Sequence, residues 1–283
     1  MFTGVGGFEL GIERATNLRP VQQDDSQGPR KCDNPANEPS GWECVGYSEI
    51  DKFCNQVMRY RFQKIKNYGD AKTIVPDELP DFDLLCGGFP CQAFSIAGNR
   101  KGFSDTRGTL FSDIVRILRV KRPRFVLLEN VKGLLNHDEG NTFGTIILSF
   151  WELGYDIQWM VLNSKFFGVP QNRERVFIIG SLRGEPRPEI LPFGETTEKV
   201  IEINKEARQA VRKYGKNGIV PPLQNWSPLL NGNQIRKLTP IECERLQGFP
   251  DNWTIGSDTQ RYKQCGNAVT TNVIAAIAEK LLW

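Results

Sequence analysis

The chain has 283 residues, of which 39% are hydrophobic and 24% are charged, and its formal net charge is +3. This is an ordinary globular composition, and the length is sufficient to bury a sizeable core. No apolar run approaches the roughly 18–20 residues that a membrane helix needs, and the first residues, MFTGVGGFELGI, lack the basic start of a secretory signal. We therefore expect neither a membrane protein nor a secreted precursor, and any basic surface must be local.

Seven cysteines occur at irregular spacings, without a C-x-x-C pair. The odd count argues against a disulfide framework or a zinc knuckle and favours a reducing compartment. The single histidine, His137, leaves little material for a Ser-His-Asp triad or a multi-histidine metal site. We expect no bound metal and mostly buried thiols, one of which can be a nucleophile.

Short apolar runs alternate with longer amphipathic ones, which predicts an α/β fold. The predicted strands are Cys44–Ser48, Asp83–Cys86, Phe125–Glu129, Ile157–Leu162 and Arg175–Gly180. The predicted helices are Phe8–Thr16, Lys52–Phe62, Thr109–Lys121, Phe143–Leu153, Pro240–Gln247 and Thr270–Leu282. This succession predicts a doubly wound parallel sheet with helices on both faces, and its last two strands can form an antiparallel hairpin at the sheet edge.

Two stretches break the alternation. Residues 18–42 are rich in Pro, Gln, Asp and Asn, which is typical of a long surface loop. From residue 181 to 233 prolines interrupt the pattern, apart from one amphipathic segment, Lys199–Tyr214. Between Arg183 and Lys237 there are ten Lys or Arg against six Asp or Glu. We expect a second, small domain here; an amphipathic surface helix explains the region as well as a nucleic-acid surface does.

A glycine-rich segment, Phe2-Thr3-Gly4-Val5-Gly6-Gly7, leads into the first predicted helix. Glycines before a helix N-terminus let a ligand approach the backbone, although many such segments are only tight turns. Glu49 closes the first predicted strand, where a doubly wound fold places its ribose ligand, and Asp70 is a further candidate. For either carboxylate alone, a helix N-cap or a solvated position is the simpler explanation.

A more specific segment, Gly87-Gly88-Phe89-Pro90-Cys91-Gln92-Ala93-Phe94-Ser95, follows the second predicted strand. Its loop continues through Arg100 to Arg107-Gly108. A cysteine in a glycine-flanked loop near cations can have a lowered pKa and act as a nucleophile, whereas an arbitrary cysteine is more often structural. Cys86, inside the strand, is expected to be structural.

Two further segments place charges at strand ends. Glu129, in Leu128-Glu129-Asn130-Val131, ends an apolar strand, where partial burial would raise its pKa and let it donate a proton. Arg173 and Arg175, in Gln171-Asn172-Arg173-Glu174-Arg175, point the same way on an extended segment and can address one ligand oxygen or a carboxylate. A helix cap and a surface ion pair are the respective alternatives.

Together and in this order, these segments resemble the cytosine-5 DNA methyltransferases of the bacterial and phage restriction-modification type. GFPCQAFS, ENVKG and QNRERVFIIG match that family's catalytic segments nearly residue for residue, and RKLTPIECERLQGFPDNW and QCGNAVTTNVI follow. The resemblance implies a Rossmann-like S-adenosylmethionine-dependent methyltransferase sheet in residues 1–180 plus 264–283. It implies a small target-recognition domain in residues 181–263, with residues 18–42 as a loop insert.

The resemblance also implies the chemistry: transfer of a methyl group to C5 of a cytosine flipped out of a specific double-stranded DNA sequence. Cys91 is implied as the thiolate that adds to C6. Glu129 then engages N3 and the exocyclic amine, Arg175 contacts O2, and Arg173 braces the loop or Glu129. The base that removes the C5 proton is not identified by the sequence, and water can serve.

The implied cofactor is S-adenosyl-L-methionine. Its implied contacts are Phe2, Thr3, Gly4, Gly6, Gly7, Glu49, Ile50, Asp70, Pro90, Asn267 and Val269. The Cys91–Gly108 loop is expected to close over the flipped base, with DNA contacts from Gln92, Ser95, Arg100 and Arg107. We expect a monomer in the bacterial cytosol, associated with the nucleoid, that binds no membrane and no metal.

The sequence departs from the family pattern in two places. The family usually has a hydrophobic strand ending in Asp-Leu-Phe before the first glycine loop, whereas this chain starts at Met1-Phe2. We therefore expect the central strand to be missing or cut short. Residues 183–234 are short for a target-recognition region and show no clear aromatic and basic reading segment, so the target sequence is not predicted.

Other functions remain open on the sequence. The tRNA-methylating branch of the family shares Cys91, Glu129 and the arginine pair. A non-catalytic relative that binds cofactor or DNA is disfavoured because it has no chemical need for all of these residues. A nicotinamide oxidoreductase is disfavoured because the glycine loop lacks the usual G-x-G-x-x-G spacing.

Overall fold

The computed structural model describes residues 3–17, 42–90, 110–185, 188–190, 228–231 and 234–281. Its strands are β1 (Leu84–Gly88), β2 (Phe125–Val131), β3 (Tyr155–Asn163), β4 (Glu174–Leu182), β5 (Pro228–Asn231) and β6 (Gln234–Lys237). Its α-helices are α1 (Gly7–Asn17), α2 (Lys52–Arg61), α3 (Leu110–Lys121), α4 (Asn141–Glu152), α6 (Pro240–Leu246), α7 (Asp258–Asn267) and α8 (Thr271–Leu281). Short 3-10 turns are η1 (Ala71–Thr73), η2 (Pro76–Glu78), η4 (Lys132–Gly140) and η5 (Ser164–Phe166).

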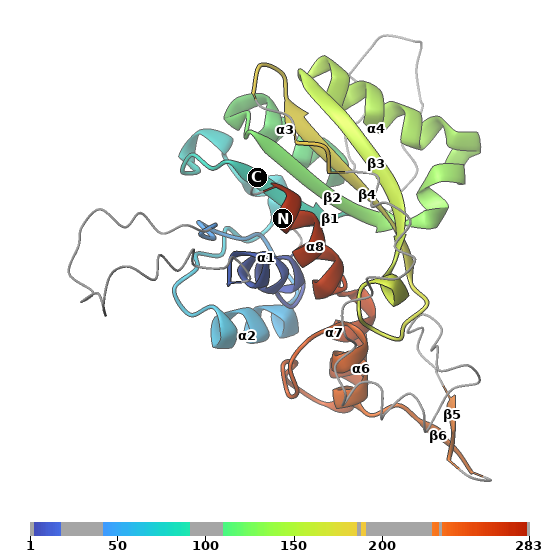
Figure 1. Ribbon diagram of the computed structural model, residues 1–283. Helices are drawn as coiled ribbons and strands as arrows, with labels where there is room; N and C mark the ends of the chain where they lie inside the picture. Colours follow the sequence, from blue (N-terminus) through green and yellow to red (C-terminus); the bar gives the residue numbers. More distant parts are fainter. Residues whose placement is uncertain are drawn as a thin grey trace, which may run out of the picture.

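The main sheet has four described strands in the order β1-β2-β4-β3 (Figure 1). β1 and β2 are parallel and α3 connects them, whereas β4 runs antiparallel to both β2 and β3. The predicted α/β fold and the antiparallel hairpin of the last two strands are confirmed. β1 lies at one end of the sheet, and the described residues before α1 form no strand.

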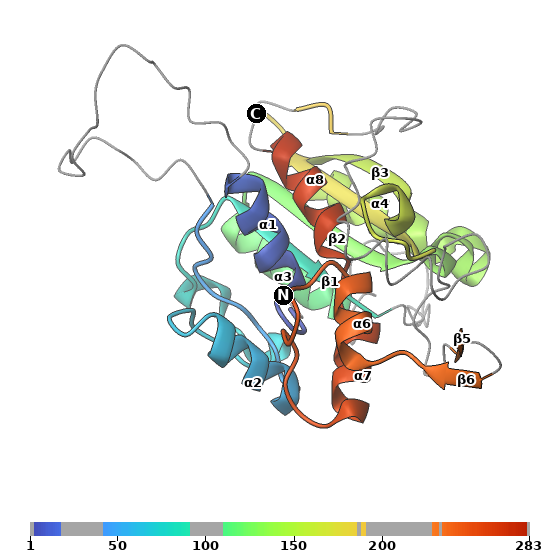
Figure 2. The same ribbon diagram turned by 60° about the horizontal axis from the view of Figure 1, so that its bottom comes forward.

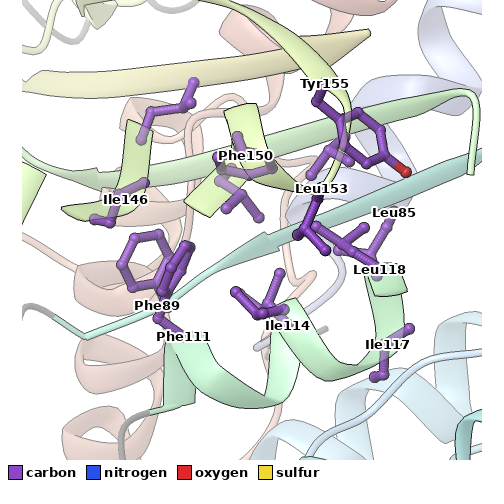
Figure 3. Packing of buried hydrophobic residues seen from close by; sticks show 14 of the residues in the cluster. Leu85, Phe89, Phe111, Ile114, Ile117, Leu118, Ile146, Phe150, Leu153 and Tyr155 are labelled. Carbon is purple, nitrogen blue, oxygen red and sulfur yellow. The ribbon is translucent and has the colours of Figure 1, made fainter. Parts of the chain in front are cut away.

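Helices cover both faces of the sheet. Alternate side chains of β2 point to opposite faces, so Val126 and Leu128 join the core under α3 and α4. Figure 3 shows this core, with Phe111 and Ile114 of α3 facing Phe150 of α4. The intervening residues of β2 enter a second core that α1 and α8 complete. The sheet is therefore the middle of three layers.

The α1–α8 contact depends on a glycine. A Cβ atom added at Gly11 would lie 2.6 Å from Cβ of Ile274 and 2.8 Å from the carbonyl oxygen of Thr271. Figures 1 and 2 both show the two helices packed side by side, although they come from opposite ends of the chain. The absence of a side chain at residue 11 permits this approach.

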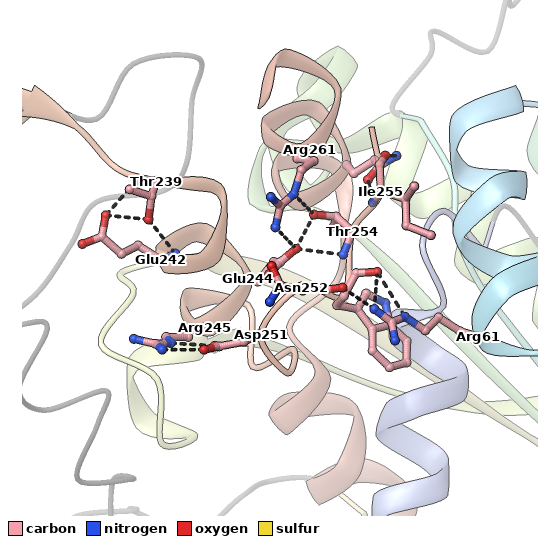
Figure 4. A network of polar contacts seen from close by, with 12 residues as sticks. Arg61, Thr239, Glu242, Glu244, Arg245, Asp251, Asn252, Thr254, Ile255 and Arg261 are labelled. Carbon is pink, nitrogen blue, oxygen red and sulfur yellow. Dashed lines mark hydrogen bonds and ion pairs between the residues drawn. The ribbon is translucent and has the colours of Figure 1, made fainter. Parts of the chain in front are cut away.

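The C-terminal helices α6 and α7 are held by a buried polar network (Figure 4). The Glu244 carboxylate accepts hydrogen bonds from the backbone N–H of Thr254 at 2.8 Å and from Arg261 Nη2 at 2.9 Å. Between the two helices, Trp253 donates from Nε1 to the carbonyl of Val5 at 2.7 Å, and Arg61 of α2 donates to the Trp253 carbonyl. The loop between α6 and α7 is thus fixed to α2 and to the segment just before α1.

Three elements differ from the sequence predictions. The predicted strand Cys44–Ser48 is wrong: this segment forms one isolated parallel bridge, Tyr47 with Asn67, because a strand also needs a neighbour along its length. α7 was missed because its residues are mainly polar, although a capping box of Ser257 and Gln260 marks its start. The short β5–β6 hairpin was also missed, and the predicted helix Lys199–Tyr214 lies outside the described residues.

We expect the substitution Gly11→Ala to lower the free energy of unfolding by about 1–3 kcal/mol, because the new methyl group forces α1 and α8 apart. The matched control is Gly144→Ala in α4, where an added Cβ atom meets nothing within 4 Å. That change should raise the free energy of unfolding by about 0.5–1 kcal/mol, because alanine restricts the unfolded chain. Urea denaturation measures both, and equal effects of the two changes would contradict the packing explanation.

Candidate active site

Three chain segments meet at one edge of the sheet. Gly88 ends β1 and pairs in register with Glu129 of β2, and Arg175, the second residue of β4, lies on the same face as Glu129. Arg175 Nε lies 3.0 Å from Glu129 Oε1, and their side chains are only 18% and 14% exposed. A Cβ atom at Gly88 would lie 3.1 Å from Glu129 Oε2. Glycine at residue 88 therefore leaves room for the carboxylate beside the segment that leads to Cys91.

Burial sets the protonation of Glu129. Loss of water raises the pKa of its carboxyl group, and the neighbouring charges of Arg173 and Arg175 counteract part of this rise. The raised pKa of Glu129 agrees with the expectation from the sequence. The carboxyl group can therefore carry a proton at a pH where an exposed glutamate is ionised.

Arg173 lies deeper than Arg175. It is 3% exposed, and its Nη2 donates to the backbone carbonyls of Ala268 at 2.9 Å and Gly266 at 3.2 Å. Burial lowers the pKa of Arg173 to about 10, so the guanidinium remains charged at neutral pH. This side chain ties the segment before β4 to the end of α7 and to the residue that follows it.

Asn130 was not among the predicted site residues. Its buried side chain donates from Nδ2 to the carbonyl of Phe89 at 2.7 Å, and its Oδ1 accepts from the backbone N–H of Val131. The contact fixes the chain one residue before Pro90-Cys91 to the end of β2. An asparagine after the apolar run Phe125–Leu128 is the sequence signal that could have identified it.

The glycine segment lies beside Glu49. The backbone N–H of Gly4 donates to Glu49 Oε2 at 2.9 Å, and Glu49 Oε1 accepts from the N–H groups of Ile50 and Asp51. Gly4 and Gly6 have positive φ angles of 60° and 81°, which an L side chain rarely adopts. A Cβ atom at Gly4 would meet nothing within 4 Å, so this part of the backbone is open to a ligand.

The contact between Gly4 and Glu49 forms what we call the Glu49 corner. The other predicted cofactor residues are distributed around this corner. Thr3 is buried and donates to Glu9, and a Cβ atom at Gly7 would lie 2.8 Å from Val269. Ile50 is 71% exposed, and Ser48 Oγ donates to the carbonyl of Gly69 at 2.7 Å, which holds Asp70 nearby. The structure thus joins the N-terminal glycine segment, the Glu49 corner and the start of α8.

Three of these residues also have ordinary structural positions. Asp70 accepts from the backbone N–H of Lys72 and caps η1, the alternative that the sequence had left open. Pro90 and Asn267 are both exposed on the described surface. Phe2, Cys91, Gln92, Ser95, Arg100 and Arg107 lie outside the described residues.

The described cysteines are poor nucleophiles. Burial raises the pKa of Cys44 to about 11 and the pKa values of Cys54, Cys86 and Cys243 to about 12, and it also raises the pKa of Cys265. At neutral pH these thiols are protonated, and a protonated thiol attacks weakly. The structural role predicted for Cys86 fits this environment.

A family model described as C-5 cytosine-specific DNA methylase matches residues 1–228 and 191–283. The chain belongs to this family of DNA methylases. It is 36% identical to the type II methyltransferase M1.ScrFI of Lactococcus lactis subsp. cremoris, over 100% of this chain and 77% of that protein. It is 35% identical to the type II methyltransferase M.HhaI of Haemophilus parahaemolyticus, over 98% of this chain and 91% of that protein. The protein is therefore a DNA cytosine-5 methyltransferase, as the sequence resemblance predicted.

Solved structures agree on the fold of the methylase. The S. pombe Dnmt2 methyltransferase superposes with a TM-score of 0.69 at 17% identity, covering 99% of this chain and 96% of that one. The Entamoeba histolytica methyltransferase EhMeth gives a TM-score of 0.58 at 16% identity, covering 99% and 95%. The predicted Rossmann-like methyltransferase sheet is confirmed.

Among the described residues of the methylase, no group of three or more His, Cys, Asp or Glu side chains is arranged to hold a metal ion. No helix in that part of the chain is long and apolar enough to span a membrane.

In the methylase we expect Arg173→Lys to lower the free energy of unfolding by about 1.5–3 kcal/mol, because a lysine cannot reproduce both buried carbonyl contacts. The matched control is Arg183→Lys, which changes a half-exposed ion pair with Asp156 at 3.0 Å. The control should stay within about 0.5 kcal/mol of the unchanged protein. Urea denaturation at pH 7 compares the two variants. An unchanged free energy of unfolding for Arg173→Lys would mean that the two carbonyl contacts do not hold the segments together.

Proposed function

We propose that the protein transfers a methyl group from S-adenosyl-L-methionine to C5 of a flipped-out cytosine in a specific double-stranded DNA sequence, through a covalent bond between Cys91 and C6. The observation that carries this proposal is the buried Glu129–Arg175 pair beside Gly88, three residues before Cys91. A carboxyl group with a raised pKa and a guanidinium at one sheet edge can donate to N3 and O2 of one pyrimidine ring at the same time.

The corner around Glu49 fits S-adenosylmethionine. Glu49 Oε2, already held by Gly4 N–H, keeps acceptor capacity for ribose hydroxyl groups. The exposed side chain of Ile50 offers an apolar surface for adenine, with Asp70 for its amino group and the open backbone at Gly4 for the amino-acid part. The segment Asn267–Val269 completes the proposed site from the C-terminal side. The bound cofactor supplies an electrophilic methyl group.

The proposed reaction divides roles among four residues. The Cys91 thiolate adds to C6, while a protonated Glu129 donates to N3 and Arg175 donates to O2, so that the ring does not accumulate negative charge. C5 then becomes nucleophilic and would take the methyl group of bound S-adenosyl-L-methionine, with S-adenosyl-L-homocysteine as the leaving group. Loss of the C5 proton to water or another base would then expel Cys91 by β-elimination, and N3 would return its proton to Glu129. Arg173 positions the Arg175 segment through its contacts to Gly266 and Ala268.

The proposed roles of the remaining parts of the chain rest on the resemblance of the sequence to the family. Residues 1–180 plus 264–283 form the catalytic part, and residues 181–263 recognise the target, with Trp253 joining that segment to Val5 and to Arg61 of α2. Gln92, Ser95, Arg100 and Arg107 contact DNA after the base has left the helix. We propose that the enzyme acts as a monomer without metal in the bacterial cytosol.

The substitution Cys91→Ser should abolish methyl transfer, with a loss of at least about 10³-fold, because a serine hydroxyl is a much weaker nucleophile than a thiolate. Transfer of labelled methyl from S-adenosylmethionine to unmethylated DNA measures the rate, with tRNA tested in parallel. Cofactor binding, measured by calorimetry, should be nearly unchanged. Label on tRNA alone would contradict the DNA assignment.

Duplex DNA with 5-fluorocytosine at the target provides a direct test of the covalent bond. After methyl transfer C5 holds fluorine in place of a removable proton, so the adduct cannot eliminate and should survive denaturation. The unchanged protein should form this complex, and Cys91→Ser should not. The matched control Cys86→Ser removes a buried thiol whose pKa is about 12 and should still form it. Equal trapping by Cys91→Ser would remove Cys91 from the nucleophilic role.

The substitution Glu129→Gln should slow transfer by at least about 10²-fold, because an amide cannot hand a proton to N3. In the unchanged protein the rate should fall as pH rises through the raised pKa of Glu129, since the protonated form is the active one. The residual rate of Glu129→Gln should lack this decrease. The rates of both proteins are measured from pH 5 to 9, with DNA binding as a control. If Glu129 is not the acid, the two proteins should have the same dependence of rate on pH.

A further inference from the structure

The two carboxylates proposed to bind the cofactor nucleoside, Glu49 and Asp70, lie on segments that pair at one point. Among the described residues these segments share a single parallel bridge, Tyr47 with Asn67. Its two backbone hydrogen bonds, of 2.9 and 2.7 Å, join Tyr47 to the residues on either side of Asn67. A regular ladder would fix the residues beyond the bridge by repeated pairing, but one bridge does not reach Glu49 and Asp70. Another group must therefore set the spacing of the two carboxylates.

The side-chain amide of Asn67 supplies this support with all of its hydrogen-bonding groups. Its Oδ1 accepts from the backbone N–H of Gly69 at 2.9 Å and from that of Glu49 at 3.3 Å. Its Nδ2 donates to the carbonyl of Glu49 at 3.1 Å and to Oδ1 of Asn55 at 2.8 Å. An asparagine amide has two donor hydrogens and two acceptor lone pairs, so all four are used. The network also fixes the orientation of the amide, because a reversed amide would turn its donors toward two N–H groups.

We propose that Asn67 is a positioning residue for S-adenosyl-L-methionine, which sets the spacing between Glu49 at the ribose and Asp70 at the adenine amino group. The inference rests on the proposed function, which puts the cofactor at these carboxylates. Asn67 holds the backbone of Glu49 and of the residue before Asp70, so it acts on the cofactor through them. A nucleoside makes both contacts together only when the carboxylates are correctly spaced. Prior fixing of this spacing therefore adds to affinity and favours a base with an exocyclic amino group.

Gly69, the residue before Asp70, is held at both of its backbone polar groups. Its N–H donates to Asn67, and its carbonyl accepts from Ser48 Oγ at 2.7 Å. Ser48 is buried and directly precedes Glu49. The φ angle of Gly69 is +74°, and a Cβ atom there would meet nothing within 4 Å, so the backbone conformation and not the available space favours glycine. Asn67 and Ser48 together set the direction in which the chain enters Asp70.

After Asp70 the chain is anchored independently of Asn67. Asp70 Oδ1 accepts from the backbone N–H of Lys72 at 3.0 Å, and Arg116 of α3 donates from Nη2 to the carbonyl of Ala71 at 2.8 Å. The second carboxylate oxygen of Asp70 keeps acceptor capacity for an amino group. Because η1 has its own contacts, removal of the Asn67 amide should displace Asp70 without unfolding the segment.

Asn55 of α2 provides a matched comparison. Its Nδ2 donates to the Glu49 carbonyl at 3.0 Å, and its Oδ1 accepts from Asn67. Both asparagines therefore hold Glu49, but of the two it is Asn67 that binds Gly69. Loss of the Asn55 amide should weaken the ribose contact alone. Loss of the Asn67 amide should weaken the ribose and the adenine contacts together.

The test measures the binding of S-adenosyl-L-homocysteine by calorimetry to the unchanged protein, Asn67→Ala and Asn55→Ala. Each is also tested with an analogue that lacks the amino group of adenine. In the unchanged protein and in Asn55→Ala, loss of the amino group should raise Kd by about tenfold. In Asn67→Ala this factor should fall to about twofold, because the contact and the residue that positions it are coupled. The same factor in all three proteins would overturn the proposal.

The nearly isosteric variant Asn67→Asp provides a second test that does not depend on the folding of Asn67→Ala. An aspartate keeps the acceptor for the Gly69 N–H and loses both donors. It should therefore weaken binding of S-adenosyl-L-homocysteine and still retain most of the tenfold amino-group factor of the unchanged protein. A factor of about twofold in this variant would overturn Oδ1 as the group that positions Asp70.

The variants Glu49→Ala and Asp70→Ala separate this inference from the proposed function. If both weaken binding of S-adenosyl-L-homocysteine and Asn67→Ala does not, the positioning role alone is overturned. If neither weakens binding, the proposed cofactor site is overturned as well. These readouts are binding constants and do not depend on methyl transfer.

Discussion

The pairing of β2 with β1 on one side and β4 on the other is the arrangement on which the rest of this structure depends. It brings Gly88, Glu129 and Arg175 to one edge, although almost 90 residues separate the first from the last. The same pairing removes Glu129 from water, which raises its pKa, and places the guanidinium that limits this rise. The geometry and the electrostatics of the site therefore have one origin.

The second requirement is that the two ends of the chain meet. Gly7 and Gly11 allow α1 to approach Val269 and Ile274 at distances that any side chain would prevent. Arg173 donates to the backbone of the same C-terminal segment, at Gly266 and Ala268. The proposed cofactor corner and the proposed cytosine site are consequently linked by one short segment, residues 266–269. A disturbance of that segment would affect both.

The sequence predicted an element correctly where its local pattern was matched by a neighbouring element in the tertiary structure. β2 and β4 appear within two residues of the expected bounds, because apolar runs of this kind are buried on both faces of a sheet. Cys44–Ser48 has the same local pattern but forms only one bridge, since pairing depends on a neighbouring strand. α7 shows the reverse case: its side chains carry little apolar pattern, and its position is set by capping and by burial of Gln264 and Cys265.

By itself the sequence determined the α/β class, the family and the residue types of the site, because motif spacing records which chemical groups follow which strands. Only the tertiary structure decided the role of Asn130 and the burial of Arg173 against the backbone carbonyls of Gly266 and Ala268. It alone revealed the cavity that the extended segment Trp42–Ser48 and the β1 residues Leu84–Cys86 line. These properties arise from contacts between segments distant in the chain, and burial and hydrogen bonding across such distances have no local pattern in a sequence.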